Sequence, residues 1–346
     1  MKPFPWHLEA VARIVGARER LPHALLVHGP EGIGKAEFAR SLAQALLCEK
    51  PVNATACGAC DGCRWFEQGN HPDFREVVPE IDEAGEEPAE GEAPRAEAKP
   101  DAKKSLVIKV DQVRALADFI ALTTHRAGVR VLVIRPAEAM HPAAANALLK
   151  TLEEPPPATL IVLVSDRPAR VLPTIRSRCR ALALGLPPRD TALAWLRAEG
   201  VEDPATALAV AGGAPLLARE LAGPEEIALR KRVVAELSRP SGADPVLFAT
   251  GMDRIALERV VYWMQTWVQD LLRVRAGSTV RHHADSAAPI AARARAARTE
   301  ALFALERELR MARRLAAHPL NARLLAEHLM MTYNRAVPGV SAGSHR

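Results

Sequence analysis

Short apolar runs and longer helical segments alternate along the first half of the chain. Short strands are expected at 24–28, 130–134, 159–164 and 181–184, of which 130–134 and 159–164 are apolar enough for buried parallel strands. Segments with helical character precede or separate them, at 6–20, 36–47, 111–120 and 142–154. With order also resuming at 106–110, the alternation predicts a five-stranded, doubly wound parallel sheet with flanking helices, an α/β domain.

The second half of the chain is rich in Ala and Leu and carries no strand signals after Pro187-Pro188. Helical segments are expected at 189–199, 203–211, 215–238, 254–276, 289–316 and 319–335. A Pro- and Gly-containing break at 239–245 divides them, so the expected domains are 1–186, 187–240 and 245–336, with a disordered tail at 337–346. Trp263 and Trp267 share a helix face, which is more often core or subunit contact than a base-stacking site.

Length and composition fit a soluble protein of two or three domains. The 346 residues are 49% hydrophobic, which suffices for real cores. The sequence contains no run of about 18 apolar residues and no N-terminal signal region, so we expect a cytoplasmic protein without membrane contact.

The charge is unevenly distributed. The net charge is +5, yet 80–104 holds nine acids and four bases, which leaves about +10 on the remainder. That excess favours polyanions such as DNA or nucleotide, although basic surfaces more often serve solubility. Arg126 and Arg130 lie near a helix end, where solvated charge is the expected role. The Glu-, Ala- and Pro-rich segment 80–104 cannot bury enough apolar surface to offset its ordering entropy, so we expect a flexible surface loop.

A glycine-rich loop follows the first strand and precedes a helix, the setting that a phosphate-binding loop requires. Gly29, Gly32, Gly34 and Lys35 match the phosphate-loop pattern, but Ala36 stands where the pattern has a Ser or Thr hydroxyl for Mg²⁺. Phosphates could still meet backbone amides and Lys35, while a metal ion would lose one ligand. Nucleotide occupancy of this degenerate loop is therefore doubtful.

The acidic residues that an ATPase places after a later strand are also absent. Arg135 and Pro136 occupy those positions, and Glu138 reads as an ordinary acid at a helix start. Ser165 and Asp166 follow the next strand, where a polar side chain could face a phosphate or merely cap a turn.

Four cysteines lie close together after the helix that follows the phosphate loop. Cys48, Cys57, Cys60 and Cys63 have the spacing C-x8-C-x2-C-x2-C, with Gly and Ala between them that allow tight turns. Four thiolates at this spacing are typical of a tetrahedral structural Zn²⁺ site. Unligated thiols, or a disulfide pair, are the alternatives. Because protein sulfurs would fill all four coordination positions of the metal, such a site would stabilise an inserted segment and leave no open coordination position for catalysis.

Taken together, the motifs resemble those of bacterial DNA polymerase III clamp-loader subunits of the AAA+ superfamily. The resemblance rests on the phosphate loop, the cysteine insertion, the run Asn146–Pro156, and Ser177-Arg178-Cys179 within a segment that holds three arginines in five residues. It implies an AAA+ α/β domain with a zinc-binding insertion, a small helical lid domain and an all-α collar domain.

The resemblance also implies roles for particular residues. It assigns the four cysteines to zinc and Arg178 to an arginine finger that reaches ATP bound by a neighbouring motor subunit. A permanently charged guanidinium supplied in trans stabilises the charge that develops on the transferred phosphoryl group. The turn 213–216 lacks the arginine that motor subunits place there. We therefore expect no intrinsic ATPase activity.

The implied partners are the motor and delta subunits of a ring joined through the collar, the sliding clamp, and primed DNA. Two alternatives are an ATP-hydrolysing motor subunit and a zinc-containing nucleic-acid-binding module with a vestigial ATPase fold. The missing hydroxyl and acidic pair argue against the first. With 4% aromatic residues and no interleaved Arg/aromatic stripe, the sequence offers little for the second.

Overall fold

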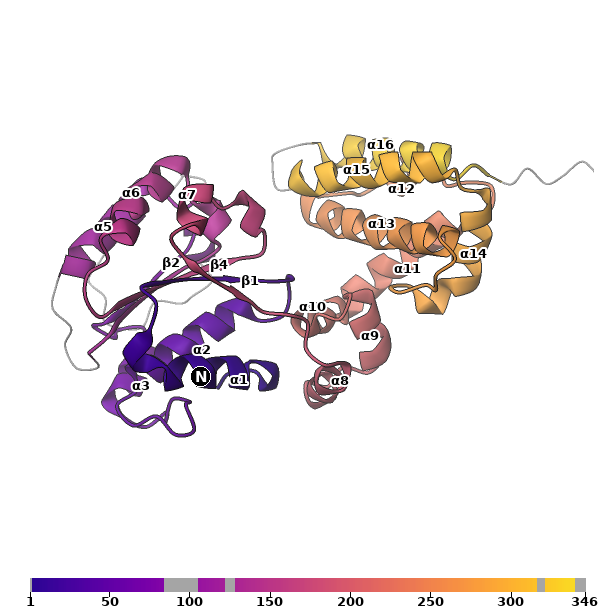
Figure 1. The fold of residues 1–346 in the computed structure, drawn as a ribbon. Coiled ribbons are helices and arrows are strands. Elements are labelled where there is room, and N and C mark those ends of the chain that lie inside the picture. Colours follow the sequence, from indigo (N-terminus) through magenta and orange to yellow (C-terminus); the bar gives the residue numbers. More distant parts are fainter. Residues whose placement is uncertain (1, 84–104, 122–127, 316–320, 340–346) are drawn as a thin grey trace, which may run out of the picture. The chain divides into compact units, whose positions relative to one another are not determined.

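The computed structural model describes residues 2–83, 105–121, 128–315 and 321–339 (Figure 1). The chain divides into two compact units, 1–191 and 192–346. The separation of 187–240 from 245–336 into two domains stays a prediction.

The first unit is built on a five-stranded sheet. Its strands are β1 (Ala24–His28), β2 (Phe74–Val77), β3 (Arg130–Ile134), β4 (Thr159–Ser165) and β5 (Arg180–Ala183). Every neighbouring pair is parallel, in the order β2-β3-β4-β1-β5. The expected parallel sheet flanked by helices is confirmed, including the four short strands.

One strand differs from the expectation. No element was expected at β2, whose sequence Phe-Arg-Glu-Val alternates apolar and charged residues and lies at the sheet edge. Residues 106–110 contribute no strand to the sheet, because Ile108 forms only an isolated bridge to Met140 and a helix begins at Val110. An edge strand is half solvated, so it lacks the continuous apolar run that marks a central parallel strand.

Helices cover both faces of the sheet (Figure 1). One face carries three helices: α5 (Val110–Ala121), α6 (Pro142–Glu153) and α7 (Pro173–Arg176). The other carries α1 (Leu8–Gly16), α2 (Lys35–Leu47) and α3 (Asp61–Glu67). Alternate strand residues such as Leu26, Leu132 and Leu163 pack with α5, α6 and α7 in one core. Helix boundaries follow the sequence: Pro142 starts α6 and three prolines follow its end.

The acidic segment is only partly within the described residues. Its first residues form a short helix, α4 (Glu80–Glu83), so the expectation of a flexible loop is wrong at this end. Glu80 explains the order, because its carboxylate accepts a hydrogen bond from the backbone N–H of Ser105 and pairs with Lys109. Residues 84–104 lie outside the described part.

The register of the sheet decides which loops meet. His28, the last residue of β1, pairs with Ser165 of β4 and with Ala183 of β5. Because the strands are parallel, the phosphate loop after β1 and Asp166 after β4 share the carboxyl edge of the sheet. The residues that precede β1 and β5 share the opposite, amino edge, where Leu25 pairs with Arg180.

The second unit is helical. Its helices are α8 (Arg189–Ala198, which begins in the first unit), α9 (Pro204–Val210), α10 (Pro215–Leu221), α11 (Pro224–Ser238), α12 (Pro245–Phe248), α13 (Arg254–Arg275), α14 (Ala287–Ala296), α15 (Thr299–Leu315) and α16 (Ala322–Ala336). One hydrophobic core runs through all of them. Trp263 and Trp267 are fully buried in it, so they belong to the core, one of the two roles expected for them.

Three expected boundaries shift. The segment 215–238 is two helices, broken before Pro224, and 289–316 is divided where Ala297 takes an extended conformation after α14. The tail does not begin at Val337, which is buried and whose carbonyl accepts a 2.7 Å hydrogen bond from Arg293. Residues 340–346 lie outside the described part.

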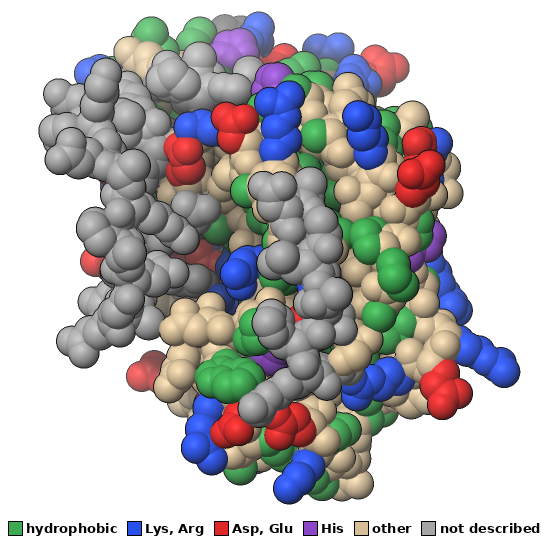
Figure 2. All heavy atoms as spheres, turned by 90° about the vertical axis from the view of Figure 1, so that its left-hand side faces the viewer, with side chains coloured by type: hydrophobic (Ala, Val, Ile, Leu, Met, Phe, Trp, Pro, Cys, Tyr) green, Lys and Arg blue, Asp and Glu red, His purple; other side chains and the backbone are tan. Residues whose placement is uncertain are grey.

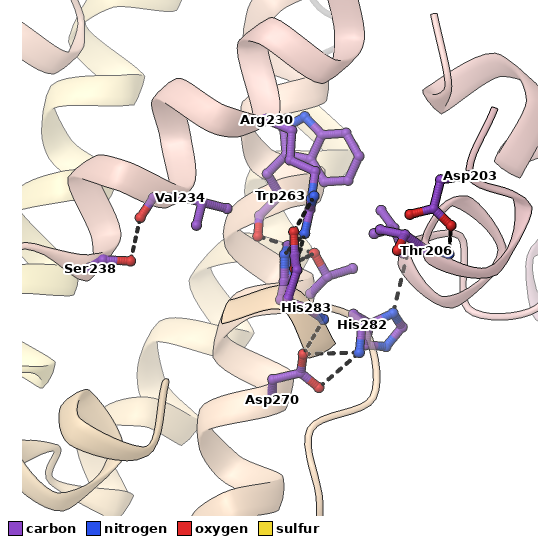
Figure 3. A network of polar contacts seen from close by, with 12 residues as sticks. Asp203, Thr206, Arg230, Val234, Ser238, Trp263, Asp270, His282 and His283 are labelled. Carbon is purple, nitrogen blue, oxygen red and sulfur yellow. Dashed lines mark hydrogen bonds and ion pairs between the residues drawn. The ribbon is translucent and has the colours of Figure 1, made fainter. Parts of the chain in front are cut away.

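A buried polar network ties α11 and α13 to the segment before α14 (Figure 3). The Asp270 carboxylate accepts hydrogen bonds from the backbone N–H groups of Arg281, His282 and His283. His283 lies between Arg230, 3.2 Å from its Nδ1, and Thr266, 2.9 Å from its Nε2. A guanidinium can only donate, so Nδ1 accepts and the proton lies on Nε2, which donates to Thr266.

This network holds His283 neutral. Burial, followed by the charges of Arg230 and His282, lowers the pKa of His283 to about 3. Burial alone would raise the pKa of Asp285, but its hydrogen bonds and ion pair with Arg230 keep it below the usual range. The folded helical unit therefore disfavours a proton that the unfolded chain accepts near pH 6.5.

We predict that the helical unit loses stability as the pH falls below about 6.5. The pKa of His283 is lowered in the folded state, so its contribution is complete above the unfolded pKa and shrinks as acid protonates the unfolded chain. Between pH 7.5 and 5 the loss from this one group is about 2 kcal/mol. Urea unfolding of the native chain and of His283→Gln at both pH values measures it. A variant with an equally steep pH dependence would contradict this origin.

Candidate functional site

The phosphate loop has the backbone shape that its glycines predict. Gly32 and Gly34 have φ values of 76° and 86°, in the left-handed region that favours glycine, and Gly34 stands directly before α2. A Cβ at Gly29 would lie 2.1 Å from the carbonyl oxygen of Leu184, so the backbone there approaches the chain after β5 too closely for any side chain.

Lys35 is already paired within the chain. Its side chain is 4% exposed, and its Nζ donates to the carbonyl of Pro30 and forms an ion pair with the Asp166 carboxylate. The sheet register brings these two residues together, since β1 and β4 are neighbours. The Asp166 carboxylate therefore already neutralises the Lys35 ammonium that would otherwise pair with a bound phosphate.

The turn that carries Asp166 is held in place by two side chains. The Glu138 carboxylate accepts hydrogen bonds from the backbone N–H groups of Asp166 and Arg167, both at 3.1 Å. Ser165 accepts a further bond from Arg167, so its role is to cap the turn. Glu138 is thus more than an ordinary acid at a helix start, because it binds the end of β4.

An aromatic segment packs against the loop from the N-terminus. Phe4 and Trp6 stack with ring centroids 4.8 Å apart, and Trp6 Nε1 donates to the carbonyl of Ile33 at 2.9 Å. A Cβ at Gly34 would lie 2.6 Å from the Phe4 ring. His7 is buried beside them, and burial, together with the charge of Lys35, lowers its pKa to about 4.

The positions of the missing acidic pair are filled by a charge network. Arg135 pairs with one oxygen of Glu76 at 2.5 Å, and Arg40 of α2 pairs with the other at 2.8 Å. Glu76 comes from β2, the strand that the sequence pattern did not reveal. The cation after β3 is therefore neutralised inside the domain by the carboxylate of Glu76.

Arg130 contradicts the expectation of solvated charge. It is 2% exposed, donates to the carbonyl of Ile120 at 2.7 Å, and lies beside Asp73 and over the Phe119 ring. Arg130 therefore serves the interior of the domain. Arg126 lies outside the described residues.

The four cysteines converge on one point. The sulfurs of Cys48, Cys57, Cys60 and Cys63 all lie within 4.8 Å of one another. The Sγ atoms of Cys48 and Cys60 are 3.8 Å apart, and those of Cys57 and Cys63 are 3.9 Å apart. Sulfurs at the corners of a tetrahedron around Zn²⁺, each about 2.3 Å from the metal, lie ~3.8 Å apart. A disulfide-bonded pair would lie about 2.05 Å apart, and all four cysteines are free thiols in the structure.

The backbone around the cluster is arranged to stabilise thiolates. N–H groups of Cys57, Ala59, Cys60 and Cys63 point at sulfurs over 3.3–3.5 Å. The bonds from Ala59 and Cys60 lower the pKa of Cys57 to about 6. Burial has the opposite effect on Cys48 and Cys63, whose pKa values are raised. Four sulfur atoms that converge on one point are the ligand set of a closed metal site.

Arg178 lies at the amino edge of the sheet, away from the phosphate loop of its own chain. Its backbone carbonyl is 3.1 Å from Nε2 of His23, the residue before β1, whereas Gly29 follows the other end of that strand. His23 and Gly29 are six residues apart along an extended strand, or ~20 Å. The guanidinium is 35% exposed, pairs with Glu153 at 2.6 Å and donates to the carbonyl of Thr174 at 2.9 Å.

Residues 9–187 match the family described as DNA polymerase III, delta subunit, and residues 224–334 match its C-terminal counterpart. A DNA polymerase III subunit delta' from Pseudomonas aeruginosa is 37% identical over 78% of this chain and 77% of its own length. The chain belongs to the delta-prime family of DNA polymerase III subunits. The Escherichia coli delta' subunit is 31% identical over 82% of this chain and 78% of its own length.

Other similarities are weaker. The DNA polymerase III subunit tau of Salmonella typhimurium is 36% identical over a shorter region, which covers 46% of this chain and 21% of the tau subunit. A solved gamma-subunit-related protein of Thermotoga maritima covers 95% of the chain and 99% of its own, with a TM-score of 0.44 and 18% identity.

The described surface shows no gathered basic groove on the face seen in Figure 2. Lys and Arg side chains alternate there with acidic ones. No helix in the described part of this delta-prime family member combines the length and the apolar character that a membrane crossing requires.

Three residues of the site were not assigned from sequence. Glu76 lies in the unexpected strand, and Glu153 lies in a run noted only as part of a motif. Asp166 was recognised as a polar residue after a strand, but the partner it finds is Lys35, not a phosphate. A carboxylate after one strand and a lysine after its neighbour were the available signal, and the strand order was needed to connect them.

We predict that Asp166→Asn both destabilises the chain and frees the phosphate loop. Lys35 is nearly buried, so loss of its counter-ion costs roughly 1–2 kcal/mol, less than in a fully buried pair because Asp166 is 40% exposed. Added inorganic pyrophosphate should restore part of that loss by binding the folded state. Thermal unfolding of the native chain, the variant and the exposed-site control Asp82→Asn, each with and without pyrophosphate, measures this. Equal pyrophosphate shifts in all three would contradict the prediction.

Proposed function

We propose that this chain is the non-hydrolysing subunit of a clamp loader and supplies Arg178 to ATP bound by a neighbouring motor subunit. The observation that carries the proposal is the position of Arg178 at the opposite edge of the sheet from its own phosphate loop. At ~20 Å a side chain cannot reach a nucleotide on its own loop, so a phosphoryl group that it serves must belong to another chain. The guanidinium then stabilises charge on the transferred group.

The chain's own loop supports a passive role. Ala36 provides no hydroxyl for Mg²⁺, Arg135 pairs with Glu76 in place of the acidic pair, and Lys35 is engaged by Asp166. These three features remove metal binding and phosphate charge compensation independently. They disfavour the alternative of an ATP-hydrolysing motor subunit.

The partners follow from this proposal. The similar proteins are named as DNA polymerase III subunits, and a tau subunit is among them. The motor and delta subunits would be the neighbours in a cytoplasmic ring, joined through helices of the region 245–336. The assembly would open a sliding clamp and load it on primed DNA.

Zinc is the metal proposed for Cys48, Cys57, Cys60 and Cys63. Sulfur spacings of 3.8 and 3.9 Å and a ligand set of four thiolates suit tetrahedral Zn²⁺. The metal would hold the segment 48–63 against the end of α2, where Gly62 approaches the carbonyl of Leu47 so closely that a Cβ would lie 2.8 Å away. Its role would be structural.

We predict that Arg178→Ala lowers ATP hydrolysis at the neighbouring site by roughly 10³-fold or more, because an arginine finger contributes about that much. Single-turnover hydrolysis by the assembly reconstituted with motor subunits measures the effect. Arg176→Ala, an exposed arginine two residues away, is the matched control and should change the rate by less than about two-fold. The isolated chain should be silent. An unchanged rate with Arg178→Ala in an intact assembly would overturn the proposal.

We predict that the purified chain carries about one zinc ion and that Cys63→Ser carries almost none, because loss of one thiolate opens a closed four-ligand site. The variant should also unfold at lower temperature. Cys179→Ser is the control, since Cys179 lies outside the cluster and should leave the zinc content unchanged. Metal analysis by mass spectrometry decides the matter, and a native chain without zinc would exclude this metal.

A further inference from the structure

We propose that Glu153 is the resting partner of Arg178, which it holds until a phosphate of the neighbouring ATP takes its place. This inference rests on the proposed function of Arg178. It assigns a role to the end of the run Asn146–Pro156, which the phosphate-loop and cysteine motifs leave unexplained.

The pairing is set by packing beneath it. Glu153 ends α6 and Arg178 follows α7, and the two helices share a core in which Leu152 and Ile175 are buried. The backbone N–H of Arg178 also donates to the carbonyl of Ile175 at 3.0 Å. Both charged residues therefore project from backbone that the core fixes, which explains why they meet at 2.6 Å.

The guanidinium has partners at both Nη atoms and stays partly exposed. Its Nη2 pairs with Glu153, and its Nη1 donates to the carbonyl of Thr174 at 2.9 Å and lies 3.4 Å from the Ser177 hydroxyl. The side chain remains 35% exposed and that of Glu153 49% exposed. A guanidinium has five N–H donors, so the carboxylate restrains it without exhausting them.

The chemistry of the exchange is a replacement of one anion by another. A carboxylate and a phosphate both accept paired N–H bonds from arginine, but a triphosphate carries more charge. Glu153 must release Nη2 before the finger can bind with its full donor set. The pair therefore stabilises the assembly without ATP, and it is equally absent from the ATP-bound ground state and from the transition state.

That equality predicts a specific kinetic signature. Removing an interaction present only in the free enzyme lowers KM and leaves kcat unchanged. For a half-exposed ion pair the expected drop in KM is about two- to five-fold. If Glu153 instead positioned the finger for catalysis, its loss would lower kcat.

The test uses the complete assembly with native motor subunits. Steady-state hydrolysis at varied ATP concentration is compared for the native chain, Glu153→Gln, and Glu154→Gln. Glu154 is the matched control because it is the adjacent exposed glutamate and forms no ion pair with a described residue. We expect KM to fall two- to five-fold only in Glu153→Gln, with kcat unchanged. Unchanged KM, or a lower kcat, would overturn the inference.

A double variant separates this inference from the proposed function. In the Arg178→Ala background, Glu153→Gln should have no further effect, since its partner is gone. If Arg178→Ala lowers the rate while Glu153→Gln alone leaves KM unchanged, the proposed function of Arg178 is supported and the proposed role of Glu153 is wrong. If Arg178→Ala has no effect, both the proposed function of Arg178 and the proposed role of Glu153 are wrong.

Discussion

The parallel pairing of β1 with both β4 and β5 is the constraint on which the rest of the domain depends. It places the ends of these three strands at one edge of the sheet and their beginnings at the other. The phosphate loop and Asp166 meet at the first edge, and Arg178 and His23 meet at the second. A strand of ordinary length thus separates the phosphate-loop residues from Arg178.

Charge compensation within the domain follows from the same order. The cation of the phosphate loop finds Asp166, and Arg135 finds Glu76 from the neighbouring strand. A nucleotide and its metal normally supply these counter-charges in an ATPase. Here side chains supply them, which allows the carboxyl edge of the sheet to be stable without a ligand.

The sequence predicted what depends on local pattern. β3 and β4 were evident because they are buried on both faces, and the cysteine cluster because its four ligands lie within sixteen residues of chain. β2 was missed because Arg75 and Glu76 interrupt its apolar pattern at a sheet edge. The pairs Lys35–Asp166 and Arg178–Glu153 could not be predicted, because the strand order and the packing of α6 on α7 bring them together.

The two ion pairs differ in a way that matters for exchange. Lys35 is 4% exposed, so separating it from Asp166 leaves a nearly buried ammonium without a partner, which is costly. Arg178 and Glu153 are 35% and 49% exposed, so water can solvate each when they separate, and the pair contributes little to stability. A weak pair still fixes a preferred side-chain position. The same kind of contact therefore engages Lys35 of the phosphate loop at one edge of the sheet and leaves Arg178 partly exposed at the other.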